Sequence, residues 1–156
     1  MTPKTATNLF LLALAAISMA GCKSYETRTY DVTVRNDTPD AIVVWLTKDG
    51  APYESGWLSP EDIAIQSPKA NDPELAGAIV AAGKTADTGT RKGRFEPDTH
   101  AILRVYQGQL KFSEILATSR GDPMRIDLQL PPGRSEFIVR PAGSLITVQR
   151  VEPFGQ

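Results

Sequence analysis

Short stretches in which apolar and polar residues alternate constrain the fold of this chain most strongly. In the first of them, residues 27–35, Tyr30, Val32 and Val34 fall on one face and polar side chains on the other. This period of two is typical of a half-buried strand. Twelve glycines and twelve prolines interrupt the 156 residues, and such frequent turn residues favour short elements over long helices. The pattern therefore predicts a mainly β protein.

The same reading predicts where the elements lie. Strands are expected at residues 27–35, 41–46, 101–106, 110–116, 125–130, 136–139 and 144–151, and residues 84–94 are expected as an exposed strand and loop. The first two strands are expected to pair as a hairpin. Ser59-Pro60-Glu61-Asp62 has the residue types of a helix start and predicts a single helical turn. Residues 75–82 could form two turns of helix or a strand, and periodicity does not decide between them.

Strands at this spacing, with turns between them, predict an antiparallel two-layer sandwich of about seven or eight short strands with one or two short helical turns. An immunoglobulin-like arrangement is the default expectation. The Cys…Trp…Cys signature of antibody-type domains is absent from the sequence, so this expectation rests on architecture alone. A small closed barrel would give a similar pattern.

The first 22 residues have the organisation of an export signal. Lys4 is the only charged side chain among the first eight, an apolar stretch of 11 residues follows at 9–19, and small residues then lead to Cys22, the only cysteine. A charged start, a short apolar region and small residues at a cleavage point are typical of a secretory signal peptide. A helix of this length would rise roughly 16 Å, about half of the hydrocarbon core of a bilayer.

Met19-Ala20-Gly21-Cys22 resembles the lipobox of bacterial lipoprotein precursors, which is usually Leu, Ala or Ser, Gly or Ala, and Cys. The match covers the last three positions, and Met19 replaces the usual Leu. The resemblance implies cleavage before Cys22, a diacylglycerol thioether on its sulfur, and a fatty acid such as palmitate on the new amino terminus. It also implies that Lys23, in the place of a retaining Asp, directs export to an outer membrane where the cell has one.

This resemblance divides the chain into a signal peptide at 1–21, a lipidated tether at 22–26 and a β-sandwich domain at 27–156. The alternative is a secreted protein that is cut nearby and keeps Cys22 as a free thiol. Loss of Lys4 with the signal changes the balance from 17 basic and 18 acidic residues to 16 and 18. This balance gives no reason to expect a nucleic acid partner, and a single cysteine allows no internal disulfide.

No catalytic residue, metal ligand or cofactor is expected from the motifs. His100, the only histidine, lies two residues from Asp98, so the two would share a face of a strand. A metal site or a hydrolase could use this pair, but a hydrogen-bonded pair at a strand edge is the favoured interpretation. No Gly-x-Ser-x-Gly motif presents a serine nucleophile.

Tyr53 and Trp57 are the candidate ligand-binding residues, because exposed aromatic rings bind sugars and peptides. Trp57 lies between Gly56 and Ser59-Pro60, whereas Trp45 lies inside an apolar stretch and is expected in the core. Burial of Trp57 at a strand end is the competing and favoured interpretation. Two further motifs are expected to be ordinary turns: the basic group Arg91, Lys92 and Arg94, and the tripeptide Arg120-Gly121-Asp122.

Together these features predict a lipid-anchored cell-envelope lipoprotein with a noncatalytic binding or structural domain held at the membrane surface. The anchor would be the cell membrane or outer membrane, with the domain facing the periplasm or the exterior. Its expected partner is another envelope protein or a cell-wall polymer. The alternatives are a carbohydrate- or peptide-binding module centred on Trp57 and a hydrolase that uses Asp98 and His100.

Overall fold

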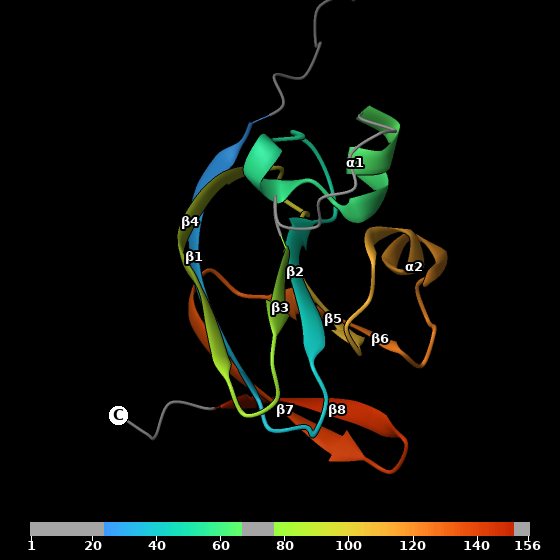
Figure 1. Ribbon diagram of the computed structural model, residues 1–156. Coiled ribbons are helices and arrows are strands. Elements are labelled where there is room, and N and C mark those ends of the chain that lie inside the picture. The colour runs from blue at the N-terminus through green and yellow to red at the C-terminus, as the bar shows by residue number, and fades with distance from the viewer. Residues whose placement is uncertain (1–23, 67–76, 152–156) are drawn as a thin grey trace, which may run out of the picture.

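Eight strands form two four-stranded sheets in residues 24–66 and 77–151, the part of the chain that this computed structural model describes (Figure 1). The strands are β1 Glu26–Asn36, β2 Ile42–Lys48, β3 Gly77–Val80, β4 Thr85–Phe95, β5 Ala101–Gln107, β6 Arg125–Leu130, β7 Gly133–Ala142 and β8 Leu145–Val151. The first sheet has the order β4-β1-β7-β8 and the second sheet the order β3-β2-β5-β6. The predicted mainly β architecture with two sheets is therefore confirmed.

The pairing of β1 departs from the expectation in two ways. The predicted hairpin between β1 and β2 is wrong, because β1 lies in the first sheet beside β4 and β7 while β2 lies in the second sheet beside β3 and β5. In addition, β1 pairs with β7 in parallel, and all other strand pairs are antiparallel. A five-residue turn leaves room for the chain to change sheets, which a two-residue hairpin loop would prevent.

Three short helical segments complete the described structure: the 3₁₀-helix η1 Ser55–Trp57, α1 Pro60–Gln66 and α2 Phe112–Ala117. The predicted helix start is confirmed in α1, where Ser59 Oγ accepts the Asp62 N–H at 3.1 Å and Asp62 Oδ2 accepts the Ser59 N–H at 3.0 Å. The open choice at residues 75–82 resolves as strand for Gly77–Val80. None of the described helices is long and apolar enough to cross a membrane.

The expected strand at 110–116 is instead the helix α2. Its start is capped by Glu114, whose Oε2 accepts the Lys111 N–H at 2.6 Å. Phe112 and Ile115, three residues apart, are both buried, which is the spacing of one helix face. In a short apolar run the periods of strand and helix are hard to distinguish, and the capping residue was the signal that favoured the helix.

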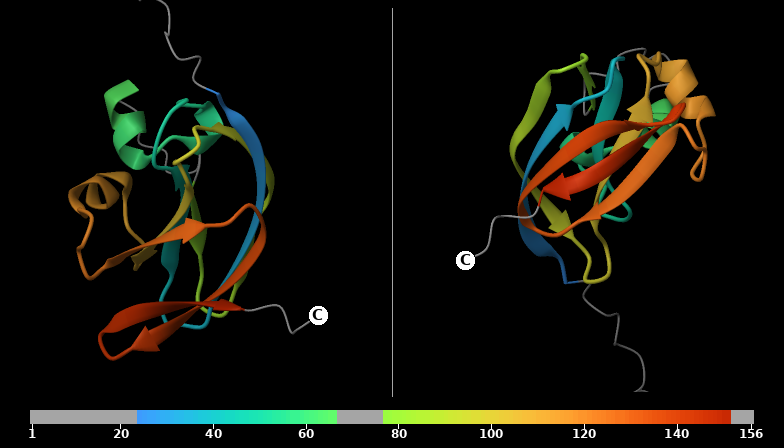
Figure 2. Two further views of the ribbon diagram at one scale, coloured as in Figure 1. Left: turned by 180° about the vertical axis from the view of Figure 1, so that it is seen from behind. Right: turned by 90° about the horizontal axis from the view of Figure 1, so that it is seen from below.

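The main core lies between the two sheets and is built from the inward-facing residues of both. Its fully buried members include Val32 and Val34 of β1, Leu46 of β2, and Leu103 and Val105 of β5. A second apolar cluster lies on the outer face of the second sheet, where α1 and α2 cover it (Figures 1 and 2). This cluster contains Val43, Trp45, Ile63, Tyr106, Phe112 and Ile115. The second sheet is therefore apolar on both faces along β2, which explains the unbroken apolar sequence of that strand.

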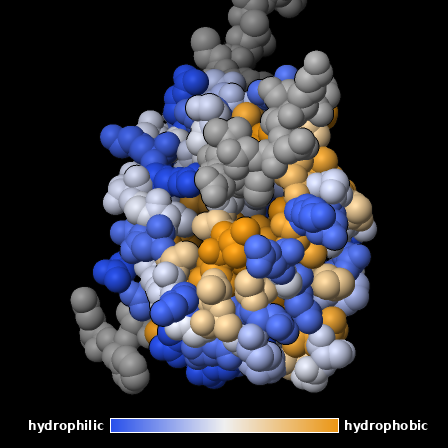
Figure 3. All heavy atoms as spheres, in the orientation of Figure 1, coloured by the Kyte–Doolittle hydropathy of each residue, from blue (hydrophilic) through white to orange (hydrophobic). Residues whose placement is uncertain are grey.

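Hydrophobic residues also reach the surface, as Figure 3 shows near the centre of the face that it presents. The edge strand β3 contributes Ala78 and Ile79, both exposed. Ile79 leaves about half of its surface accessible, at 49 %. An edge strand with apolar side chains is a place where a further strand can pair.

The buried Asn36 joins the segments that link the two sheets. Its side-chain Nδ2 donates to the Asp40 carbonyl at 2.8 Å and to the Val80 carbonyl at 2.9 Å, and its Oδ1 accepts the Thr38 N–H at 2.9 Å. Its backbone N–H donates to the Lys84 carbonyl at 2.8 Å. One side chain therefore fixes the β1–β2 crossover against the end of β3.

We expect Asn36→Ala to lower the free energy of unfolding by about 3 kcal/mol, because the buried carbonyl groups of Asp40 and Val80 lose their donor. Asp40→Ala is the matched control, since only the backbone of this exposed residue takes part in the network. Urea unfolding, monitored by circular dichroism, gives the free energy of unfolding of both variants. Equal stability of the two variants would contradict the role given to Asn36.

Trp57 packs with Tyr30 and Phe95 in a cluster of three rings, with centroid separations of 5.3–5.4 Å. Gly93 of β4 lies against the indole: a Cβ atom at this position would stand 2.5 Å from Trp57 Nε1 and 2.8 Å from Trp57 Cε2. Trp57 Nε1 also donates to the Lys92 carbonyl at 3.1 Å. The indole can therefore occupy this position only because residue 93 has no side chain.

Gly93→Ala should destabilise the protein by about 1–3 kcal/mol, because the extra methyl group forces the indole out of its position. Gly56→Ala is the control, since a Cβ there meets nothing within 4 Å, and its effect should stay within about 0.5 kcal/mol. Thermal unfolding monitored by Trp fluorescence gives both values. A neutral Gly93→Ala would show that the cluster tolerates repacking.

Candidate functional site

The register of the second sheet arranges polar residues in rows on its outer face. Arg104 of β5 is paired with Asp127 of β6 on one side and with Trp45 of β2 on the other. In the next row Ile102 is paired with Gln129. Because alternate residues of a strand point to one face, these side chains share the outer face with the apolar cluster under α1 and α2. The helices cover the β2 side, and the polar groups occupy the β5–β6 side.

Arg125 and Asp127 form the most buried ion pair of this surface. Arg125 Nε and Nη2 donate to the two carboxylate oxygens of Asp127, both at 2.8 Å, and the Arg125 side chain is only 4 % exposed. Its Nη1 donates to the Thr118 carbonyl at 3.2 Å, and its guanidinium lies 5.8 Å from the Tyr106 ring centre. The hydrogen bonds to Asp127 raise the pKa of Arg125. A two-pronged pair of this kind fixes both side chains.

Glu61, in the first turn of α1, joins the helix to the two arginines. Its Oε2 accepts from Arg104 Nη1 at 2.6 Å and its Oε1 from Arg125 Nη1 at 3.4 Å. Desolvation by burial raises the pKa of Glu61, but the hydrogen bond from Arg104 and further favourable contacts outweigh this effect, so the pKa lies below its usual value. Glu61 is therefore held as a carboxylate.

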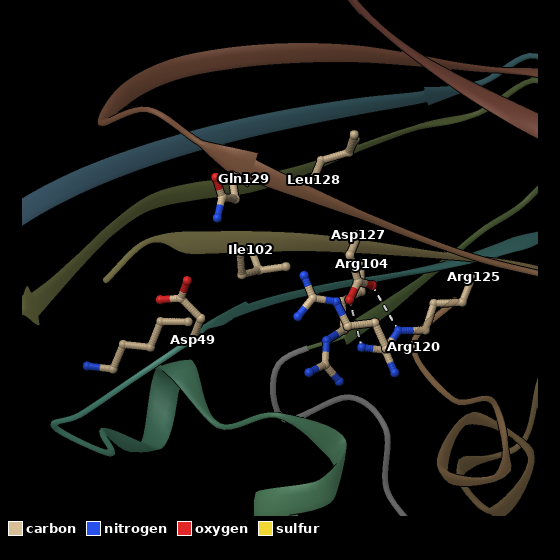
Figure 4. A pocket seen from close by; sticks show the side chains of 9 residues that line it. Asp49, Ile102, Arg104, Arg120, Arg125, Asp127, Leu128 and Gln129 are labelled. Carbon is tan, nitrogen blue, oxygen red and sulfur yellow. Dashed lines mark hydrogen bonds and ion pairs between the residues drawn. The ribbon is translucent and has the colours of Figure 1, made fainter. Parts of the chain in front are cut away.

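A cavity of about 440 Å³ opens beside these groups (Figure 4). The polar residues that line it are Lys48, Asp49, Arg104, Arg120, Arg125, Asp127 and Gln129. In Figure 4 the three arginine side chains gather at one end, whereas Asp49 and Gln129 lie toward the other end and Ile102 lies between. The volume is within the range of small-molecule sites.

Two of these arginines keep unused hydrogen-bond donors. Arg104 Nε and the neighbouring Tyr106 hydroxyl are buried and make no well-aligned hydrogen bond in the described part of the chain, although the two side chains lie close enough to interact with one another. Arg120, exposed in the segment between α2 and β6, forms no ion pair with any described residue. Three guanidinium groups thus face two carboxylates, Glu61 and Asp127, and one positive charge remains. This arrangement can bind an anion.

The structure does not bring the predicted ligand-binding residues Tyr53 and Trp57 together as an aromatic face. Tyr53 is 67 % exposed, but Trp57 is 3 % exposed and packs in the core. The favoured interpretation, burial of Trp57, is therefore confirmed, and the alternative of an exposed Trp57 is wrong. Trp45 lies in the core as predicted, where its Nε1 donates to the Leu58 carbonyl at 2.9 Å.

His100 has a different acidic neighbour from the one expected. Asp49 Oδ1 accepts the His100 backbone N–H at 2.6 Å, and Asp49 Oδ2 lies 3.4 Å from His100 Nδ1. The predicted pairing with Asp98 is not among the contacts of the described residues. Within the same residues, no group of three or more His, Cys, Asp or Glu side chains is placed to hold a metal ion.

The other basic motifs take distinct places. Arg91, Lys92 and Arg94 belong to β4 rather than to a loop, and Arg91 Nη1 donates to the Gly56 carbonyl at 2.8 Å. Arg120 of the tripeptide lines the cavity, while Asp122 Oδ1 accepts the Met124 N–H at 2.8 Å in a turn. Cys22 and the rest of the lipobox lie outside the described residues.

The cavity arginines were not predicted as a site from the sequence. The available signal was the placement of Arg104 in the middle of the apolar stretch 101–106, together with the polar face of Arg125, Asp127 and Gln129. Only the strand register shows that these two faces are adjacent.

Lowering the pH should weaken the protein through Glu61. Because its folded pKa lies below the usual 4.5, its contribution is present above about pH 4.5 and is lost as the pH falls through the folded pKa. The contribution should be about 0.5 kcal/mol, since the carboxylate is 45 % exposed and solvent screens the pair. Glu61→Gln should therefore reduce the loss of stability between pH 7 and pH 3, measured by urea unfolding.

Arg104→Gln should reduce this loss by a similar amount, because it removes the partner that lowers the Glu61 pKa. The double variant should add little to either change. Full additivity of the two substitutions would contradict a direct interaction between these side chains.

Comparison with known proteins adds no further identification to this geometry. Neither family models nor curated proteins nor solved structures gave a match to the chain. The chemistry that can be assigned to the cavity therefore follows from the side chains that line it.

Proposed function

We propose that this protein is a lipid-anchored lipoprotein of the cell envelope, whose β domain is a noncatalytic binding domain held at the membrane surface. The observation that carries the proposal is the position of β1. This strand begins at Glu26, four residues after Cys22. Four residues span at most about 14 Å, so a lipid on Cys22 would hold the domain close to the bilayer.

Near its start, β1 is hydrogen-bonded to a neighbouring loop, and this loop contacts a second one. Arg28 Nη1 donates to the Thr99 carbonyl at 2.7 Å, and the Asp49 carboxylate accepts the His100 backbone N–H. These contacts support an interpretation in which the loops at 49–50 and 96–100 face the membrane. The partner of such a domain would be an envelope protein or a cell-wall polymer.

The charge states around the cavity favour binding over catalysis. General acid–base catalysis works best with a group whose pKa lies near the working pH. Here ion pairing moves the pKa of Glu61 down and that of Arg125 up, in both cases away from neutrality. Groups held permanently charged in this way are suited to binding a charged ligand.

We also propose an immunoglobulin-like relationship for the fold. It is supported by two packed sheets whose connections repeatedly pass from one sheet to the other, as in β1–β2, β3–β4 and β6–β7. The four-plus-four strand count and the parallel β1–β7 pair distinguish this domain from the constant-type arrangement of antibody domains.

The anchor is tested by growing cells that express the full chain with a radiolabelled fatty acid. The parent protein should carry the label and remain in the membrane fraction, because two or three acyl chains bind a bilayer essentially permanently. Cys22→Ala should lose the label, and the matched variant Ser24→Ala should keep it. An unlabelled parent, or a fully labelled Cys22→Ala, would overturn the proposal.

A further inference from the structure

The free donors of Arg104 lie on the edge of its guanidinium that suits a carboxylate. In Arg125 the edge formed by Nε and Nη2 holds both oxygens of Asp127. In Arg104 the interaction with Glu61 uses Nη1, and Nε makes no well-aligned hydrogen bond within the described residues. Two arginines in adjacent rows of the outer face thus differ in one respect: the Nε edge holds a carboxylate in Arg125 and holds none in Arg104.

Arg104 Nε is buried and makes no well-aligned hydrogen bond to a described residue, and the Arg104 side chain interacts at close range with the Tyr106 hydroxyl, which can accept as well as donate. Buried polar groups nearly always find a hydrogen-bond partner, and an unsatisfied donor in a native structure calls for an explanation such as an absent ligand. A rotation of the Arg104 side chain toward the cavity would present Nε and Nη2 together. Glu61 is 45 % exposed and can follow this movement without leaving solvent.

The charge of the cavity selects a ligand with one negative charge. Glu61 and Asp127 neutralise two of the three guanidinium groups, and the exposed Arg120 supplies the remaining charge. A single carboxylate restores neutrality at this end, whereas a phosphate monoester would bring an excess negative charge close to Asp127. The geometry of the Arg104 guanidinium and the net charge at this end of the cavity therefore both favour a carboxylate.

The opposite end of the cavity has a different chemistry. Asp49, whose carboxylate also contacts His100, offers acceptor oxygens and Gln129 an amide, with Ile102 between them and the arginines (Figure 4). Lys48 also lines the cavity, and its charge is paired with Glu54 at 2.7 Å. Acceptor oxygens and an amide at this end suit hydroxyl groups. The distance along β5 from Arg104 to Ala101, which pairs with Lys48, is about 10 Å. A ligand that contacts both ends of the cavity therefore has to be larger than a simple ion.

We propose that the cavity binds a small hydroxylated organic acid, such as an acidic sugar unit, with its carboxylate on Arg104 and Arg120 and its hydroxyl groups toward Asp49 and Gln129. This assignment deepens the binding role in the proposed function by naming the class of ligand.

The test is a titration of the ¹⁵N-labelled full protein, purified from the cell fraction in which it occurs, with sodium glucuronate at constant ionic strength. Arginine Nε–H and backbone amide signals are followed by nuclear magnetic resonance. The Arg104 Nε–H signal should move saturably, together with the backbone amides of Ile102 and Gln129. Glucose, which lacks the carboxylate, should cause no saturable shift.

Three variants make the titration specific. Arg104→Gln and Arg120→Gln should each weaken binding by about tenfold or more, as read from the Gln129 amide, because each removes a charged hydrogen bond to the carboxylate. Arg120→Gln is the stronger test, since this exposed residue forms no ion pair with the described residues and its loss should leave the fold intact. Arg134→Gln, a highly exposed arginine of the first sheet, is the matched control and should bind as the parent does.

Absence of saturation with glucuronate, or unchanged binding by Arg120→Gln, would overturn the proposal. Tighter binding of inorganic phosphate than of glucuronate would overturn the carboxylate assignment and identify phosphate as the ligand group. Neither result depends on the acylation of Cys22, which the fatty-acid label tests separately. Failure of the ligand assignment is therefore distinguishable from failure of the membrane anchor.

Discussion

The buried amide of Asn36 is the interaction on which the two-sheet arrangement depends. A sandwich whose chain changes sheets repeatedly has to satisfy the backbone groups of each crossover away from water. Asn36 does this for two segments at once, because its amide nitrogen contacts the carbonyl groups of Asp40 and Val80. Its own backbone carbonyl accepts the Gly83 N–H at 2.8 Å. The β1–β2 and β3–β4 connections are thereby fixed to one another, and the positions of β2 and β3 in the second sheet follow.

The outer face of the second sheet is divided between an apolar part and a charged part. Along β2 this face is apolar and carries the two short helices, which bury Trp45, Phe112 and Ile115. Along β5 and β6 the same face carries charges, and α1 contributes Glu61 at the boundary. The helix start that Ser59 and Asp62 specify thus has two consequences. It places α1 at the boundary of the apolar cluster, and it places the Glu61 carboxylate between two arginines.

Most of the strands could be predicted from sequence because their alternation is local. Residues 125–130 were assigned with the observed bounds of β6, and the capping residues of α1 were recognised. The sequence-based predictions are wrong where contacts between residues distant in sequence determine the structure. The segment at 110–116 becomes a helix because one face packs on Trp45, and β1 separates from β2 because of contacts around Asn36. The cavity could not be predicted, since Glu61, Arg104 and Arg125 meet only through strand register and helix position.

The parallel pairing of β1 with β7 has a mechanical consequence. β1 lies inside the first sheet, paired with β4 on one side and with β7 on the other. A force applied at the N-terminal end of β1 would pull along this strand, roughly at right angles to the hydrogen bonds on both sides. Many bonds would then share the load in shear instead of opening one after another. The first sheet is therefore well built to resist tension that is applied along β1.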